Sequence, residues 1–579
     1  MKTTLKILRY TRPHSLYFVL AIVCAVISVS LTLYIPVLVG NAIDFMLGKG
    51  QVDFAKITEI TVKIAVMVAL VALFQWLMGH CTNVISARTV RDMRSDIFRK
   101  LNRVPLSYID GHPHGDLISR ITNDVEAVGD GLTQVITQLF AGIVTIVGTL
   151  IFMLSINVKI ALVVVVLTPL SILVAAIIGR MCSKSFREQQ ELQGEISAYV
   201  EEIVGNQKTV KAFAFESRSA EEFDRKNKRL FKVGLRAQFA GALANPCTRF
   251  VNNMVYAATG IIGAVTVLNA FMGVLTIGQL SCFLTYANQY TKPFNEVTGV
   301  LTQIQTALAA GGRIFAVLES DDEPSDSDKK EIENVKGDIE FKNVRFSYTP
   351  EKPLIEDFSL SVTSGQQVAI VGPTGCGKTT LINLIMRFYE VQSGEILIDG
   401  VNTRDIRRAD LRHLFGMVLQ DSWLMHGTIM ENLRYGKPDA TDEEVIAAAK
   451  LSYAHSFIRK MPHGYDTVIT EGGSNLSAGQ KQLLCIARAM VLDPPMLILD
   501  EATSSIDTLT EIRVQKAFRK LMQGRTSFVV AHRLSTIRES DIILVMNKGN
   551  IVEQGSHEEL LSKKGFYYEL YNSQFSSDS

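Results

Sequence analysis

The sequence predicts a multidomain membrane protein, in which a six-helix, all-α transmembrane domain precedes an α/β domain with a phosphate-binding loop. Three observations support this fold class. The chain has 579 residues, which is too long for one hydrophobic core. Long uncharged stretches lie only in the first 300 residues. Beyond residue 318 the composition becomes polar, and short β-like runs then alternate with helical patterns.

Five stretches contain no Asp, Glu, Lys or Arg: 13–43, 64–87, 131–158, 160–179 and 250–291. A membrane-spanning helix needs about 20 apolar residues. The last stretch is long enough for two such helices with a turn near Asn269–Gly273, which brings the number of predicted spans to six. So many stretches of this kind favour a membrane domain over the buried helices of a soluble protein.

Basic residues predict the orientation of these spans. Lys and Arg are frequent before the first span, between spans two and three, and from 180 to 249. The loops between the other spans are short: one around 44–63 has mixed charge, one turns at Asn157, and one has no charge. By the positive-inside rule, both ends of the membrane domain face the cytoplasm. The first span is too long for a signal peptide and is expected to remain as an anchor. The two long basic segments have helical patterns and are expected to extend the spans beyond the lipid.

Cysteine and charge exclude several classes of protein. The seven cysteines are scattered singly, and their odd number and spacing fit neither a disulfide framework nor a zinc site. The formal net charge of +1 carries no electrostatic signal for nucleic acid, and we expect no nucleic-acid partner.

The composition predicts four segments. Residues 1–318 form the transmembrane domain with its helical extensions, and the acidic, polar residues 319–336 form a linker. Residues 337–573 form the α/β domain, and 574–579 form a disordered tail.

The run GPTGCGKTT fits the phosphate-loop pattern G-x-x-x-x-G-K-[ST]. A buried strand, QQVAIV, precedes it, and a helical pattern, TTLINLIMRFY, follows it. Glycines let the backbone curl around phosphates, Lys378 reaches the β- and γ-phosphate oxygens, and Thr379 binds Mg²⁺. The sequence therefore predicts an ATP and Mg²⁺ site formed by Gly372, Pro373, Thr374, Gly375, Cys376, Gly377, Lys378, Thr379 and Thr380.

The run MLILDE predicts a buried strand that delivers two carboxylates to the phosphate edge of a sheet. We expect Asp500 to hold Mg²⁺ and Glu501 to polarise the attacking water as a general base. Such an ending is more often the start of a solvated loop, and its pairing with the phosphate loop favours the catalytic interpretation.

Three further candidates follow predicted strands. Gln420 is expected to contact Mg²⁺ or water, His532 the γ-phosphate, and Tyr348 the adenine ring. The alternatives are a surface amide, a core histidine and an ordinary strand aromatic.

Taken in order, Tyr348, GPTGCGKT, Gln420, LSAGQ, LILDEATSSID and His532 resemble the successive loops of an ABC transporter ATPase domain. With six spans on the same chain, the sequence resembles an exporter-type half-transporter of the bacterial multidrug or lipid class. The runs 107–125 and 201–213 resemble the family's two intracellular coupling regions. The resemblance implies that Tyr348 stacks on the base, that Gln420 senses nucleotide, that His532 holds the γ-phosphate, and that Asp507 lies between two ATPase domains.

A second turn, LSAGQ, opens onto a helical pattern, and a helix start with free N–H groups favours an anion. The resemblance implies that Ser477, Ala478, Gly479 and Gln480 complete the ATP site of a second half-transporter. Glycine is usual at position 478, and a methyl group there is expected to push the phosphate away, or to cost about 1 kcal/mol if the backbone needs a positive φ.

Ala478 and the QLL continuation resemble the catalytic-glutamate subunit of heterodimeric exporters. The sequence therefore favours a heterodimer in the cytoplasmic membrane, with a homodimeric lipid or peptide exporter, an ATP-gated channel or regulator, and an importer as alternatives. The expected substrates are amphipathic or hydrophobic small molecules, drugs or lipids, because polar and aromatic residues of the last two spans are candidates to line a pocket. Helix–helix packing is the alternative for Asn252, Asn253, Tyr256, Phe283, Tyr286, Asn288, Gln289 and Tyr290.

Overall fold

The computed structural model describes the chain except residues 1, 47–51, 270–273, 333, 350, 420–421, 501–505, 532–533 and 575–579. Side chains are also left undescribed at 2, 170–172, 175–176, 178–183, 244–245, 269, 295–298, 471, 534–535 and 574. The chain forms two compact units. The first comprises Met1–Arg103 and His112–Ser320, and the second comprises Val104–Gly111 and Asp321–Ser579.

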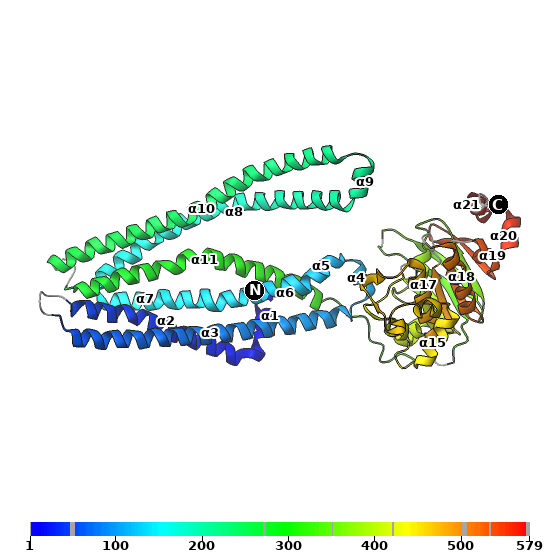
Figure 1. The fold of residues 1–579 in the computed structure, drawn as a ribbon, viewed down its shortest axis with the longest axis horizontal. Helices are drawn as coiled ribbons and strands as arrows, with labels where there is room; N and C mark the ends of the chain where they lie inside the picture. The colour runs from blue at the N-terminus through cyan, green and yellow to red at the C-terminus, as the bar shows by residue number, and fades with distance from the viewer. Residues whose placement is uncertain are drawn as a thin grey trace. The chain divides into compact units, whose positions relative to one another are not determined.

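In its described residues the first unit contains helices and no strands (Figure 1). A short helix, α1 (Lys2–Thr11), and a single turn (Arg12–His14) lead into the long helices. These are α2 (Ser15–Asp44), α3 (Phe54–Leu101), α5 to α7, α8 (Val158–Gly205), α10 (Glu216–Asn269) and α11 (Ile277–Leu318). Helices α5 (His114–Ser119), α6 (Val125–Gln134) and α7 (Ala141–Ile156) form one rod with π-helical segments at Arg120–Asp124 and Val135–Phe140, and α9 (Gln207–Ala212) joins α8 to α10.

Helices cover all six predicted spans, although they differ in apolar character. Among the described residues, four helices are long and apolar enough to cross a membrane: Thr3–Asp44, Phe54–Leu101, His114–Ile156 and Glu216–Leu268. Helix α8 contributes a shorter apolar segment, Val158–Pro169. Helix α11 carries Asn, Gln, Tyr and Lys within its first turns, which lowers its hydropathy. The turn predicted near Asn269–Gly273 falls on residues outside the described part of the chain, apart from the backbone of Asn269.

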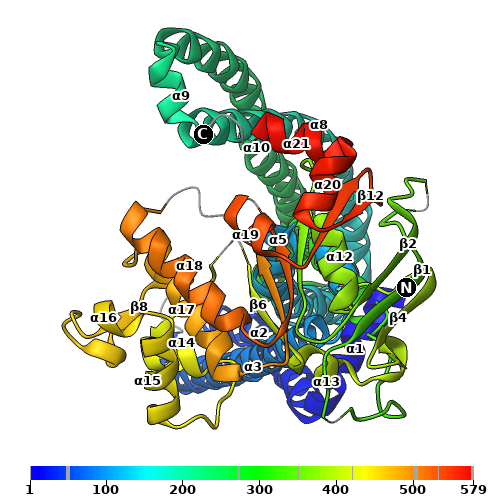
Figure 2. The same ribbon diagram turned by 90° about the vertical axis from the view of Figure 1, so that its right-hand side faces the viewer.

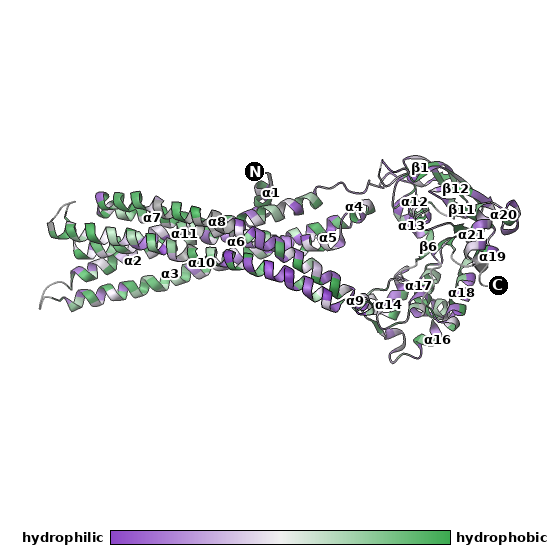
Figure 3. Ribbon diagram, turned by 90° about the horizontal axis from the view of Figure 1, so that it is seen from above, coloured by the Kyte–Doolittle hydropathy of each residue, from purple (hydrophilic) through white to green (hydrophobic). Residues whose placement is uncertain are grey.

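Hydropathy divides the helices along their length. Figure 3 shows hydrophobic residues along α2, α3 and α7 in the half away from α9, and hydrophilic residues on the helices beside α9. The long basic segments thus continue as helix, as their pattern predicts. Asn157 makes the predicted turn between α7 and α8, where its side chain accepts hydrogen bonds from the amides of Lys159 and Ile160 and caps α8.

The second unit is built on a six-stranded, mostly parallel sheet in the order β12-β11-β3-β10-β9-β6. Its strands are β3 (Gln367–Val371), β6 (Phe415–Val418), β9 (Met496–Asp500), β10 (Thr526–Val530), β11 (Ile542–Asn547) and the antiparallel edge strand β12 (Asn550–Gly555). A second, antiparallel sheet has the order β2-β1-β4-β5 and comprises β1 (Ile339–Phe346), β2 (Ile355–Val362), β4 (Ser393–Ile398) and β5 (Val401–Asn402). A small pair of strands, β7 (Gly427–Thr428) and β8 (Val468–Ile469), completes the set.

Helices surround these sheets, and Figure 2 shows α17 and α18 beside one another, with β1, β2 and β4 on the other side of the unit. The helices of this unit include α12 (Lys378–Ile385), α13 (Arg408–His413), α17 (Ala478–Leu492) and α18 (Thr508–Met522). The remaining helices are α4 (Leu106–Asp110), α14 (Ile429–Arg434), α15 (Asp442–Leu451), α16 (His455–Ile458), α19 (Leu534–Glu539), α20 (His557–Lys563) and α21 (Phe566–Gln574). The tail predicted at 574–579 lies outside the described residues, except for Gln574 at the end of α21.

Helix α12 is shorter than the helical pattern TTLINLIMRFY predicts. It ends at Ile385, and Arg387 has a left-handed backbone with φ of 50°. The Arg387 guanidinium is buried and donates hydrogen bonds to the carbonyl oxygens of Thr403 and Ile406. These long-range bonds offset the cost of leaving the helix, which a local pattern does not reveal.

The predicted linker is packed against the second unit from Asp321 onward. Arg408 on α13 has a side chain only 6% exposed, and its guanidinium lies 2.6 Å from Asp326 and 3.3 Å from Glu323. The Arg408 amide also donates to Asp326, and Arg412 pairs with Glu323. The acidic composition of this segment therefore provides the partners of a buried arginine, in addition to joining the two units.

Candidate functional site

The residues expected to handle phosphate follow neighbouring parallel strands. Ile370 pairs with Val530, and Val530 pairs with Asp500, so β3, β10 and β9 end at the same level. Strand β6 ends beside β9. The carboxyl ends of adjacent parallel strands are where α/β sheets bind ligands. Glu501 directly follows β9, and His532 and Gln420 are two residues beyond the ends of β10 and β6. These three residues lie outside the described part of the chain, so their roles remain predictions.

The phosphate loop connects β3 to α12, as the sequence predicts. The Lys378 ammonium donates to the carbonyl oxygens of Gly372 and Pro373 at 2.8 and 3.1 Å, which holds the loop curled around its own lysine. Gly372 has a φ of 155°, and a Cβ there would lie 2.3 Å from the carbonyl oxygen of Met546. Thr374 and Gly375 are exposed at the turn, whereas Cys376 is buried. The loop is thus tight at Gly372 and open where phosphates would lie.

Two side chains in the described part of the site have oxygen atoms that suit Mg²⁺ as ligands. Thr379 is exposed in the first turn of α12, and Asp500 is the last residue of β9. Mg²⁺ prefers oxygen ligands and is usually bound by one or two protein groups together with substrate phosphates and water. The residue types and their positions therefore fit the predicted ion, and the third expected ligand, Gln420, lies outside the described residues.

Tyr348 lies between the phosphate loop and a cluster of aromatic rings. Its ring is 48% exposed, and its hydroxyl donates to Thr380 and accepts from Asn383. The rings of Phe346 and Tyr389 meet it edge-on at centroid distances of 4.9 and 5.0 Å. Tyr348 therefore has one face supported by the protein and enough exposed surface for a base to stack on it.

Tyr389 is a residue that the sequence did not single out. Its hydroxyl donates a hydrogen bond of 2.6 Å to Asp110, at the end of α4. Burial, together with the neighbouring Asp110 carboxylate, raises the pKa of Tyr389 above its ordinary value, so the hydroxyl stays protonated and remains a donor. Tyr389 thus contacts Tyr348, which is expected to stack on the base, and also the segment 107–125, which resembles the first coupling region.

The turn LSAGQ begins α17, as its sequence predicts. Ser477 caps the helix, since its side chain accepts from the amide of Gln480 while the Gln480 side chain accepts from the amide of Ser477. Ala478 is exposed in the first helical turn and is absent from the residues with positive φ. The condition for a strain of about 1 kcal/mol, a positive φ at Ala478, is therefore not met. Only the steric effect of its methyl group on an approaching phosphate remains.

Gly479, unlike the exposed Ala478, is constrained by close packing. It is buried, and a Cβ would lie 2.3 Å from Cγ2 of Thr510 and 2.9 Å from Cγ2 of Ile506. The start of α17 therefore approaches α18 too closely for a side chain at this position. Asp507, expected at a domain interface, caps α18 by accepting from the amide of Thr510, and this hydrogen bond lowers the pKa of the Asp507 carboxyl.

We expect Gly479→Ala to lower the stability of the second unit by about 1–3 kcal/mol, because overpacking forces α17 and α18 apart. Ala478→Gly, which removes a methyl group from the adjacent exposed position, is the matched control and is expected to change stability by less than about 1 kcal/mol. Thermal unfolding of both variants measures the difference. Equal melting temperatures for the two would contradict the close packing at Gly479.

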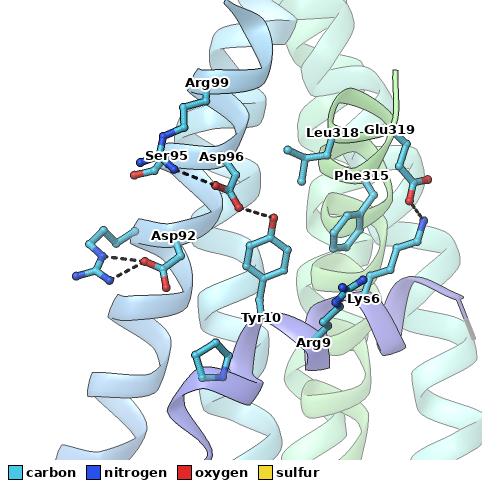
Figure 4. A pocket seen from close by; sticks show the side chains of 12 residues that line it. Lys6, Arg9, Tyr10, Asp92, Ser95, Asp96, Arg99, Phe315, Leu318 and Glu319 are labelled. Carbon is cyan, nitrogen blue, oxygen red and sulfur yellow. Dashed lines mark hydrogen bonds and ion pairs between the residues drawn. The ribbon is translucent and has the colours of Figure 1, made fainter. Parts of the chain in front are cut away.

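One cavity in the helical unit has a volume of about 770 Å³ and lies between α1, α3 and the end of α11 (Figure 4). Its charges are largely matched with one another. Arg91 pairs with Asp92, Lys6 pairs with Glu319, and the Tyr10 hydroxyl donates to Asp96 at 2.9 Å. These contacts tie the N-terminal helix to α3 and α11.

A second cavity of about 450 Å³ lies among α2, α3, α7, α11 and the π-helical segment Val135–Phe140. Of the eight residues proposed for a substrate pocket, Gln289 is the one that lines it. Phe283, Tyr286 and Tyr290 are instead buried in the core, and the Tyr286 hydroxyl donates to the carbonyl oxygen of Leu33. For these three aromatics the packing alternative holds. The sequence missed Lys292, which lines the cavity and directly follows the last uncharged stretch.

Comparison with known proteins agrees with this geometry. Residues 18–294 match the family model described as "ABC transporter transmembrane region", and residues 355–504 match "ABC transporter". A "Fatty acid ABC transporter ATP-binding/permease protein" of Mycobacterium tuberculosis is 42% identical over 526 residues, which cover 90% of this chain and 82% of the relative. An "ATP-dependent lipid A-core flippase" of Syntrophus aciditrophicus is 35% identical over 581 residues, covering 99% and 94%.

Among solved structures, a bacterial Atm1-family ABC exporter with ATP bound superposes with a TM-score of 0.77 at 29% identity, and the match covers 96% of this chain and 98% of that one. The predicted fold, a helical membrane domain followed by a P-loop ATPase domain, is confirmed. The chain belongs to the ABC transporter superfamily, as a multi-pass membrane protein of the exporter-type half-transporter class that binds ATP and couples its hydrolysis to transport.

Proposed function

We propose that this half-transporter moves amphipathic, lipid-like molecules out of the cytoplasmic membrane as one half of a two-chain exporter. The observation that carries the proposal is the cavity among α2, α3, α7 and α11, where glutamine, threonine and lysine side chains lie among apolar ones. Such a lining suits a molecule with one polar and one apolar end. The names of two relatives, a fatty acid transporter and a lipid A-core flippase, support a lipid over an unrelated drug.

Two chains are needed because this chain carries one phosphate loop and one LSAGQ turn, which by the family resemblance belong to two different ATP sites. In the proposed dimer, Lys378 holds a nucleotide from one side and Ser477 of the second half-transporter closes it from the other. ATP binding then draws the two ATPase domains together, and closure reorients the membrane helices. Glu501 orients the attacking water, His532 holds the γ-phosphate, and Asp507 lies at the contact between the domains. Thr379, Gln420 and Asp500 would hold Mg²⁺, which would supply charge neutralisation at the phosphates.

The pairing that we propose is a heterodimer. It rests on Ala478, whose exposed methyl group stands where a partner's γ-phosphate would approach. ATPase activity of the chain purified alone tests it, since a heterodimer subunit is expected to turn over weakly without its partner. Vigorous, substrate-stimulated hydrolysis by the lone chain would establish the homodimeric exporter instead.

Direction and orientation are tested together in inverted membrane vesicles. With both termini cytoplasmic, as the basic residues indicate, the ATPase domain faces the outside of such vesicles. Added ATP is then expected to drive uptake of a labelled long-chain lipid into the vesicle. Uptake only from the opposite face would support an importer, and flux without hydrolysis would support an ATP-gated channel.

The contact between Tyr389 and Asp110 leads to a prediction about coupling. Tyr389→Phe keeps the ring beside Tyr348 and removes the hydrogen bond to α4. A hydrogen bond to a charged group contributes about 1.5–3 kcal/mol, so we expect substrate stimulation of the ATPase to fall about tenfold while ATP affinity stays within about twofold. Tyr465→Phe, which removes a tyrosine hydroxyl bonded to His455 in the same unit, is the control. Unchanged stimulation in Tyr389→Phe would rule out this link.

A further inference from the structure

Lys292 is an ionisable residue in the last helix that the sequence predicts to span the membrane. It directly follows the uncharged stretch 250–291, about 15 residues into α11, and a helix rises about 1.5 Å per residue. This places it about 22 Å from the start of a helix that the sequence predicts to span a hydrocarbon layer of about 30 Å. Ionisable side chains at such depth are costly and mark binding or transport sites.

The cavity around Lys292 combines a charged side chain with neutral polar and apolar ones. Among the described residues that line it, Lys292 alone carries an ionisable group, and the other polar groups are neutral amides and hydroxyls. These belong to Ser28, Thr32, Gln75, Thr137, Gln138, Thr145 and Gln289. The remaining lining is apolar or small, including Val29, Leu33, Met78 and Pro293. The cavity therefore offers one positive charge, several hydrogen-bonding groups and an apolar wall.

The cavity of about 770 Å³ between α1, α3 and the end of α11 differs from this one in the pairing of its charges. There, basic groups face acidic ones, as in the pairs of Arg91 with Asp92 and of Lys6 with Glu319 (Figure 4). Within the described part of the chain, Lys292 makes no ion pair, and the Gln289 side-chain oxygen is buried without a hydrogen-bond partner. Buried polar atoms normally have partners, so this amide is a second sign that a ligand belongs here.

We propose that this cavity binds the acidic headgroup of a single- or double-chain lipid, with the Lys292 ammonium as its counter-ion and Gln289 as an adjacent hydrogen-bonding group. The inference rests on the proposed function and narrows it from amphipathic molecules to acidic ones. The shared chemistry is a carboxylate or a phosphate attached to a long acyl chain. The acyl chain lies along the apolar wall, and the headgroup lies toward α11.

The test is binding of radiolabelled oleate to the full-length chain in phosphatidylcholine nanodiscs, with empty discs subtracted. Methyl oleate, which has the same chain without the charge, is the comparison ligand, and oleoyl lysophosphatidate is the phosphate arm. We expect the wild-type chain to bind oleate, lysophosphatidate or both about tenfold more tightly than methyl oleate, because charge-assisted hydrogen bonds are the strong ones. The arm with the larger preference identifies carboxylate or phosphate as the headgroup.

The variants test whether the preference for the acids over the ester depends on the Lys292 side chain. Lys292→Gln is expected to lose the tenfold preference while keeping its affinity for methyl oleate, and Lys292→Arg is expected to retain most of the preference. Lys159→Gln, on α8 and outside the cavity lining, is the matched control and is expected to bind as the wild type does. Gly142→Leu, which places a bulky side chain toward Pro293 in the cavity, is expected to weaken acid and ester alike.

Glu296 is four residues beyond Lys292 on the same helix, and its side chain lies outside the described residues. Residues at this spacing can pair, so Glu296→Gln is included. If Lys292 serves the ligand, Glu296→Gln is expected to preserve or increase the acid preference. If Glu296→Gln abolishes that preference as Lys292→Gln does, the proposal is wrong.

Two other results would overturn it. If the wild-type chain binds both acids and the ester equally, the cavity does not recognise an acidic headgroup. The proposed export of amphipathic molecules is not contradicted by that result. Binding of neither acid nor ester, in a chain that still binds ATP, would defeat the inference and the proposed substrate class together. ATP binding provides the check on folding, because the nucleotide loop lies in the other unit.

Discussion

Glu501→Gln is expected to bind ATP with near-normal affinity and to lose about 10²–10⁴-fold of its turnover, the range that a positioned general base contributes. The amide keeps the size of the side chain but accepts a proton far less readily from water. Phosphate release measures the loss, and retention of labelled ATP on the stalled protein measures the binding. The assay is performed on the complete transporter, with the second half-transporter present if the pairing experiment requires one.

Glu443→Gln is the matched control for this change, since Glu443 is exposed in the first turn of α15. It makes the same chemical substitution away from the phosphate loop and is expected to leave turnover unchanged. Near-normal hydrolysis by Glu501→Gln would withdraw the general-base role from Glu501.

Lys378→Ala is expected to fail at an earlier step, by binding ATP about 10- to 100-fold more weakly. The lysine ammonium already lies inside the loop, donating to the carbonyl oxygens of Gly372 and Pro373 at 2.8 and 3.1 Å. Phosphate oxygens would take over these donors, and hydrogen bonds between charged groups contribute about 1.5–3 kcal/mol. Equilibrium binding of a fluorescent ATP analogue measures the change.

Lys342→Ala serves as its control, because Lys342 is an exposed lysine on β1 that pairs with Glu340 at 3.0 Å. The control is expected to bind nucleotide as the wild type does. Similar affinities in Lys378→Ala and Lys342→Ala would show that the loop lysine does not contact phosphate. Together, the Glu501 and Lys378 variants separate binding from hydrolysis.

Local patterns predicted the motifs of the second unit well. The strand before the phosphate loop, the start of α17 at Ser477 and the strand before Asp500 all occur where expected. Each depends on short-range signals, namely a buried apolar run followed by glycines or by a capping residue. The prediction was wrong about the length of α12, because a buried Arg387 bonded to distant carbonyls ends that helix.

Prediction from sequence was weaker wherever several elements meet. The eight residues proposed for a substrate pocket share polarity, yet Tyr286 and Phe283 became core and Gln289 became cavity lining. Which face of α11 turns toward α2 and α7 decides between these outcomes. The sequence also left open whether the backbone at Ala478 has a positive φ; the structure shows that it does not, and the close approach of α18 constrains Gly479 instead.

The sequence by itself determined that this chain has membrane helices and an ATPase domain. It also determined that the chain has one phosphate loop and one LSAGQ turn. Those properties follow from apolar length and from the spacing of glycine, lysine and serine, which are local. Only the tertiary structure brought Tyr389 to Asp110, 279 residues away in the chain, and Lys292 beside Gln75 and Gln138. Such neighbours depend on how helices pack, because burial of their apolar faces decides which polar groups are left to meet in a cavity.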